Sequence, residues 1–149
     1  ALLLDACVYI DQLQNRSPDV LDLVIATRQV SHSSVAVQEL MHTVGVLNPA
    51  DRRTSTVIAA IRSLVRSVPQ HRLHVPDVEI LGRAALLSGI LCRLQGYAAD
   101  RKLPALQDCT LFLQAQKLGF VVLTGNIGDF DVLSQLLPAG RVLFYRRKQ

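Results

Sequence analysis

Apolar residues in this chain form two patterns: short continuous runs, and longer stretches in which they recur every three or four positions. Short apolar runs bounded by turn-forming residues are typical of strands buried on both faces of a sheet. We expect strands at residues 2–5, 29–31, 73–75, 120–124 and 141–145. The periodic stretches between these runs are typical of amphipathic helices that cover the sheet.

Capping residues mark several of these helices. Ser17 precedes Pro18, which suits a capping position followed by the first helical residue. Gly119 follows a helical stretch and suits its C-terminal cap. We expect helices after the first strand through residue 13, from 18 through 25, from 33 or 34 to about 46, at 51–68, from 76 to near 96, at 106–118 and at 131–137, with a loop at 96–104. Such alternation predicts an α/β fold with a mainly parallel sheet between two helical layers.

Two acidic residues follow directly after predicted strands. Asp5 comes after the run 2–4, and Asp129 lies in the segment 124–130, just beyond the run 120–123. In open α/β sheets, ligands bind at the carboxyl ends of the strands. Two carboxylates at one edge repel each other and lose hydration, which a cation or a proton must offset. The pattern therefore predicts a divalent metal site.

Two further acids lie near the starts of predicted helices. Glu39 is one turn into a largely apolar helix, and Asp108 is near the start of another. Taken singly, Glu39 has the ordinary interpretation of a surface acid, and Asp108 that of an acid favoured by the helix dipole. In a doubly wound sheet, however, both helix starts point toward the edge that carries Asp5 and Asp129. Four acids at one edge favour the metal site.

Composition limits the class of protein. The chain has 149 residues, a mean hydropathy of +0.28 and half of its residues hydrophobic, which indicates one folded domain spanning 1–149 rather than a disordered chain. No apolar run reaches the ~20 residues that cross a bilayer. The three cysteines have no paired spacing, which favours a reducing compartment. The start lacks the basic leader of a signal peptide, so we expect a cytoplasmic protein.

The positive charge is clustered. The net charge is +4 with a pI of about 9.3. Arg62 and Arg66 share one helix face, Arg101 and Lys102 lie together, and 146–148 form a basic tail. Each cluster by itself has the ordinary interpretation of a solvated surface. Around a metal site, the same charge attracts a polyanion such as nucleic acid.

The ordered set of motifs resembles the PIN-domain family, and within it the VapC-like ribonuclease toxins. The resemblance covers nearly the whole chain and rests on four segments. These are the strand ending in Asp5, the segment 34–40 with Glu39, the helix from Asp108 to 119, and the segment 121–130, which matches the family pattern T-x-N-x-x-D-F. The last match is the most specific.

This resemblance implies a three-layer α/β/α sandwich and a metal-dependent endoribonuclease, typically a dimer held by a cognate antitoxin. Asp5, Glu39, Asp108 and Asp129 would gather around one or two Mg²⁺ or Mn²⁺ ions, with Asp5 and Asp108 as the main ligands. The metal would activate a water for hydrolysis of an RNA phosphodiester bond. Thr124 would support the site by hydrogen bonding to a ligand or to a bound water, as would Asn126.

One departure from the family pattern opens an alternative. Family members usually carry two polar residues after the first acid, whereas this chain has Ala6 and Cys7. That departure favours a catalytically weak or inactive module that binds RNA or a partner protein. The presence of all four acids favours the nuclease, because mutual repulsion makes a purely structural role for them unfavourable.

Overall fold

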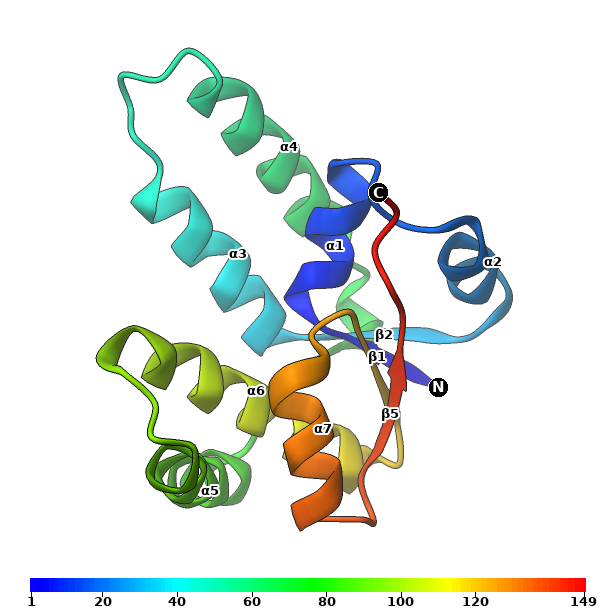
Figure 1. Cartoon of the computed structure of the whole chain (residues 1–149). Helices are drawn as coiled ribbons and strands as arrows, with labels where there is room; N and C mark the ends of the chain where they lie inside the picture. The colour runs from blue at the N-terminus through cyan, green and yellow to red at the C-terminus, as the bar shows by residue number, and fades with distance from the viewer.

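A five-stranded parallel sheet forms the centre of the computed structural model, which describes residues 1–149 (Figure 1). Its strands are β1 (Leu2–Leu4), β2 (Val30–Ser33), β3 (Leu73–His74), β4 (Val121–Thr124) and β5 (Arg141–Phe144). Their order is β3-β2-β1-β4-β5. The chain runs outward from β1 to β3 on one side and from β4 to β5 on the other. The order therefore reverses between β1 and β4, which is where ligands bind in such sheets.

Helices cover both faces of this sheet. One layer contains α1 (Ala6–Leu13), α2 (Asp19–Thr27), α3 (Ser34–Val46) and α4 (Thr54–Ser67). The other contains α5 (Val78–Gln95), α6 (Ala99–Leu118) and α7 (Ile127–Leu136). A short 3₁₀ turn, η1 (Gln70–Arg72), precedes β3. Figure 1 shows α3 and α4 as a long helical pair, with α5, α6 and α7 on the opposite side of the sheet.

Alternation along β1 explains the two layers. Leu2 and Leu4 pack into a core with α1 to α4, whereas Leu3 points the other way into a core with α5 to α7. Successive side chains of a strand face opposite sides, so an all-leucine strand supplies both cores. Burying each such side chain contributes about 1.5–3 kcal/mol. The three-layer α/β/α architecture expected from the sequence is confirmed.

The start of α6 differs from the expectation. The sequence predicts a loop at 96–104, yet α6 begins at Ala99 and Pro104 lies inside it. A proline there removes one backbone hydrogen bond. Packing against α5 outweighs that loss, because Ala105 of α6 and Leu91 of α5 are both fully buried in the same core.

Other boundaries differ as well, most of them by one or two residues. β2 covers 30–33 rather than 29–31, and α4 begins at Thr54 rather than at Asp51, whose side chain instead accepts a hydrogen bond from the Arg53 backbone. α7 begins at Ile127 rather than at Asp131, so Asp129 lies in a helix and not in a loop. No helix of the molecule combines the length and apolar character needed to span a membrane.

Candidate metal centre

Three carboxylates converge at the switch point of the sheet. Asp5 follows β1, Glu39 is on α3 and Asp108 is on α6, and each offers an oxygen within 4.8 Å of the others. Asp5 and Asp108 are buried, and Glu39 is half-buried. The group thus combines residues from both helical layers and from the end of the central strand.

Asp5 is fixed by the two strands that meet at the switch point. Its Oδ1 accepts a hydrogen bond from the Ala6 backbone N–H at 2.8 Å, which caps α1. Its Oδ2 accepts from Thr124 Oγ1 at 2.7 Å, at the end of β4. Cys7 Sγ also donates to Oδ2, at 3.4 Å. Asp5 therefore has a defined orientation before any ligand arrives.

A second set of hydrogen bonds positions the helices that carry Glu39 and Asp108. Ser33 Oγ caps α3 by accepting from the Val35 backbone N–H at 3.1 Å, and it donates to Gln114 Oε1 of α6 at 2.5 Å. The start of α3 is thereby tied to α6. Asn126 Nδ2 donates to Asp108 Oδ2 at 3.1 Å, which orients that carboxylate from the β4–α7 connection.

Burial makes the charged forms of these acids unfavourable. It raises the pKa of Asp5, despite the hydrogen bonds from Thr124, Cys7 and Ala6. Burial, and secondarily the charge of Asp5, raises the pKa of Glu39 to about 8. The pKa of Asp108 is held well above its ordinary value by burial, by the Asp5 charge and by its contact with Asp129.

The donor set fits a hard divalent cation. No lysine or arginine forms an ion pair with Asp5, Glu39 or Asp108. Clustered carboxylate oxygens without a basic partner are the ligands that Mg²⁺ and Mn²⁺ prefer. A bound cation would offset the cost of burying these charges, and it would remove the repulsion that adds to the raised pKa values of Glu39 and Asp108.

Asp129 lies beside this group but is held differently. It is 1 % exposed, in the first turn of α7. Its Oδ1 accepts a hydrogen bond from Tyr97 Oη and lies 3.5 Å from Arg101 Nη2. Its Oδ2 is buried without a hydrogen-bond partner. The structure therefore brings three of the four predicted acids into one group, and the fourth, Asp129, contacts Asp108 but is paired with a tyrosine and an arginine.

The sequence indicated Arg101 only as part of a basic cluster, and it did not reveal Tyr97, the pairing of Arg101 with Asp129 or the contacts of Cys7. Arg101 precedes Asp108 by seven residues, which is two turns of α6. That spacing would have indicated a shared helix face, had 99–105 been recognised as helical. Cys7 stands where the resemblance leads us to expect a polar residue, and its thiol contacts Asp5.

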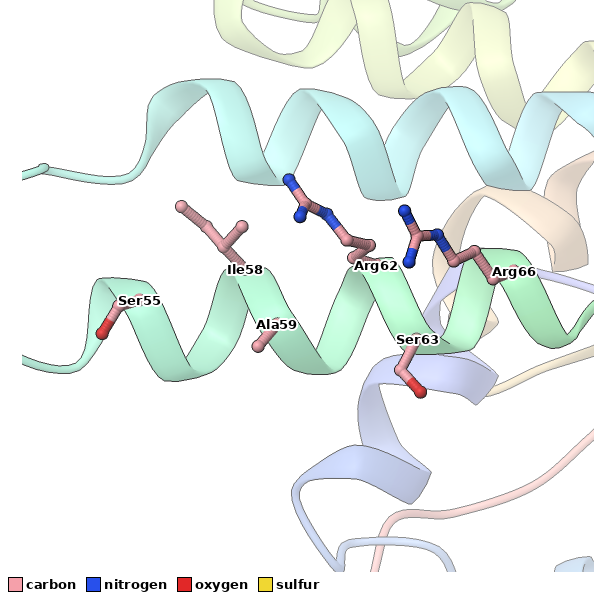
Figure 2. Close-up of a pocket in the computed structure, with 6 residues that line it drawn as sticks. All are labelled: Ser55, Ile58, Ala59, Arg62, Ser63 and Arg66. Carbon is pink, nitrogen blue, oxygen red and sulfur yellow. The ribbon is translucent and has the colours of Figure 1, made fainter.

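A separate open cavity of about 450 Å³ lies on α4 and includes no site carboxylate. Figure 2 shows Arg62 and Arg66 on the side of α4 that faces α3, while Ser63 points the opposite way. Neither guanidinium forms an ion pair with an acid. This part of α4 presents positive charge but no group suited to catalysis.

No protein-family model matches the sequence, and no curated protein matches it either. Several solved structures share its fold. A chain of FitAcB from Neisseria gonorrhoeae has a TM-score of 0.66 and 18% identity, covering 97% of both chains. A chain of VapBC-1 from nontypeable Haemophilus influenzae gives 0.63 and 19%, covering 96% of both. A chain of VapBC-5 from Mycobacterium tuberculosis, of the VapBC family of toxin–antitoxin systems, gives 0.56 and 20%, covering 98% of both.

These likenesses span almost the full length of each chain compared, so they concern the whole fold rather than one motif. The PIN-like fold implied by the sequence motifs is confirmed. In fold, this chain is similar to chains of VapBC and FitAB complexes.

Proposed function

We propose that the protein is a metal-dependent endoribonuclease, a VapC-like toxin that hydrolyses RNA phosphodiester bonds. The observation that carries this proposal is the buried group of Asp5, Glu39 and Asp108 at the switch point of the sheet. A structural role does not account for three adjacent carboxylates that lack any basic partner. The likeness in fold to chains of toxin–antitoxin complexes agrees with the proposal.

Each residue of the site has a role in this proposal. Asp5, Glu39 and Asp108 would hold Mg²⁺ or Mn²⁺, and Asp129 would complete the acidic set from α7. The bound cation would supply an activated water and neutralise charge on the scissile phosphate. Thr124 and Asn126 would keep Asp5 and Asp108 in their ligating orientations, through the hydrogen bonds that they already donate.

An RNA substrate suits the charge of the surface. The net charge is +4, although the site itself is acidic, so the excess of positive charge lies elsewhere. Lys102, Arg62 and Arg66 are exposed and form no ion pair with an acid. The charges of such residues are stabilised more by a bound polyanion than by neighbours within the chain. We propose that the protein binds and cleaves this substrate in the cytoplasm.

An antitoxin partner suits the grooves beside α4. One groove of about 230 Å³ between α3 and α4 is lined by Met41, Val44, Ile58, Ile61 and Val65, with Arg62 and Arg66 also lining it. A second, of about 240 Å³, lies between α1, α3 and α4. An apolar groove lined in part by arginines fits an amphipathic helix with acidic residues. We propose that a helix of the cognate antitoxin occupies the groove between α3 and α4.

The exposed face of α5 is suited to the interface of a homodimer. Leu86, Ile90 and Leu94 recur one helical turn apart and are 73%, 42% and 58% exposed. An apolar stripe of this kind on a protein surface is typical of an interface. We propose that a second copy of the chain covers it.

The test of the nuclease is cleavage of an end-labelled single-stranded RNA with Mg²⁺, with Mn²⁺ or with EDTA. We expect cleavage only with metal, and its loss in Asp5→Asn and Asp108→Asn, both of which should fold because a neutral amide relieves the repulsion. Asp131→Asn is the matched control, since Asp131 is exposed on the same helix as Asp129. Undiminished cleavage by the Asp108 variant would contradict the assignment.

The alternative is a non-catalytic module that binds RNA or a partner. The replacement of the usual polar pair by Ala6 and Cys7 favours it, but Cys7 Sγ still donates to Asp5. Tight binding of RNA without metal and without cleavage would select this alternative.

A further inference from the structure

Arg101 is the only basic residue that pairs with one of the four predicted site acids. Its guanidinium lies 3.5 Å from Asp129 Oδ1, and its side chain is 50% exposed whereas that of Asp129 is 1% exposed. Arg101 also lies two helical turns before Asp108 on α6, so both residues project from one face of that helix. A cation is therefore held at the rim of the acidic group and reaches solvent from there.

Tyr97 connects Arg101 to a cavity. The Tyr97 hydroxyl donates to Asp129, and the Arg101 guanidinium carbon lies 5.3 Å from the centroid of the Tyr97 ring. Tyr97 also lines a cavity of about 540 Å³ between α5 and α6, together with Ser88, Arg93 and Lys102. Tyr97 and Arg101 thus contact the buried acid at the edge of the site, and the cavity lined by Tyr97 adds the basic groups of Arg93 and Lys102.

We propose that Arg101, Tyr97 and this cavity form a nucleotide subsite, in which Arg101 binds an RNA phosphate next to the scissile one and the cavity takes the attached nucleoside. The inference rests on the proposed nuclease function and adds residues that select and position its substrate. Arg93 and Lys102 would neutralise further phosphates along the same strand.

The chemistry of the Arg101–Asp129 pair favours a substrate-binding role for Arg101 over a purely structural one. A half-exposed arginine gains little from a carboxylate at 3.5 Å, because solvent screens the pair. A phosphate offers the guanidinium two oxygens at once, in the geometry that its planar group prefers. Asp129 would keep its hydrogen bond from Tyr97 when Arg101 turns toward the phosphate. Stacking of a base on a tyrosine ring is tolerant of sequence.

The experiment measures binding and cleavage of a short single-stranded oligoribonucleotide by the full chain. Binding is measured by fluorescence anisotropy in Ca²⁺, with the integrity of the RNA checked on a gel, over a series of salt concentrations. The variants are Arg101→Gln, Arg101→Lys, Tyr97→Ala and Tyr97→Phe. Arg28→Gln is the control, because Arg28 is exposed just before β2, at the opposite edge of the sheet from the site.

We expect Arg101→Gln to weaken binding about tenfold, as one lost charge-assisted hydrogen bond predicts. The slope of log affinity against log salt should fall by roughly 0.7, the value for one phosphate contact on a single strand. In cleavage assays KM should rise with little change in kcat, and Arg101→Lys should recover part of the affinity. Tyr97→Ala should weaken binding more than Tyr97→Phe, which keeps the ring.

Wild-type affinity and salt slope in Arg101→Gln would overturn the subsite, and cleavage lost only in Asp108→Asn would then leave the nuclease intact. If the wild-type protein binds RNA without cutting it, a tenfold weaker affinity in Arg101→Gln supports the subsite while the nuclease is contradicted. A wild-type protein that neither binds nor cuts would overturn the proposed function and the subsite together. Thermal unfolding of each variant separates lost binding from lost folding.

Discussion

Glu39 is the residue whose environment in the structure differs most from the one that its position in the sequence suggests. It looks like an ordinary surface acid one turn into a helix, yet burial and the neighbouring Asp5 raise its pKa to about 8. Near neutral pH, burial of this carboxyl is favourable only if it keeps its proton or if a cation neutralises its charge. The residue therefore links the acidity of the medium to metal binding and to folding.

This linkage predicts an unusual dependence of stability on pH in EDTA. Because the folded pKa of Glu39 is raised from 4.5 to about 8, its contribution to stability is full below pH 4.5 and is lost as pH rises through 8. Between pH 6.5 and 8 the melting temperature of the wild type should fall, and that of Glu39→Gln should fall less. Parallel melting curves for the two proteins across this range would contradict the raised pKa.

Cys7 supports a second prediction at this scale. Its thiol donates to Asp5, and it accepts a hydrogen bond from the Gly125 backbone N–H at 3.4 Å. Cys7→Ser keeps both contacts, whereas Cys7→Ala removes them. Calorimetric titration with Mn²⁺ should show binding weakened by up to about tenfold in Cys7→Ala, the low end for groups that orient a metal ligand. Equal affinity in both variants would show that the thiol only fills space.

At the scale of elements, the sequence predicts the strands better than the helix starts. β1 and β4 are short apolar runs, which are buried best as strands inside a sheet. Their ends position Asp5 and Thr124. The start of α6 could not be predicted, because Pro104 opposes a helix locally and only packing against α5 outweighs it. The pairing of Arg101 with Asp129 was missed for the same reason.

The turn before β5 gives a prediction at this scale. A Cβ added at Gly140 would lie 2.1 Å from Cζ of Phe112, whose side chain is fully buried in α6. Gly140→Ala should therefore lower the free energy of unfolding by about 1–3 kcal/mol, the usual effect of overpacking. Gly82→Ala, whose added Cβ meets no atom of its own chain within 4 Å, should raise it by about 0.5–1 kcal/mol. Urea unfolding of both variants measures the contrast.

At the scale of the whole molecule, the reversal of strand order brings distant acids together. Asp5 and Asp108 are far apart in the chain but share one edge because β1 and β4 are neighbours. This much follows from strand order, and the sequence predicts it once a parallel sheet is assumed. The pairing of Asp129 with Arg101 does not follow, because it depends on how the first turns of α6 and α7 approach each other.

The proposed homodimer is tested at the same scale. Leu86→Glu places a charge at the most exposed residue of the apolar stripe on α5 and should shift the protein to monomer in sedimentation velocity experiments. Leu23→Glu, at a 61% exposed leucine on α2, is the control and should leave the assembly unchanged. A monomeric wild type, or an unaltered dimer in Leu86→Glu, would exclude this face as the interface.

The three carboxylates come from the end of the central strand and from a helix on each side of the sheet. A cation bound among them would tie both outer layers to the middle one, and it would have no comparable site in the unfolded chain. Binding of this kind stabilises the fold by about 2.7 kcal/mol at a hundred times the dissociation constant. A shortage of divalent cations would then shorten the lifetime of the protein against proteases as well as stop its reaction.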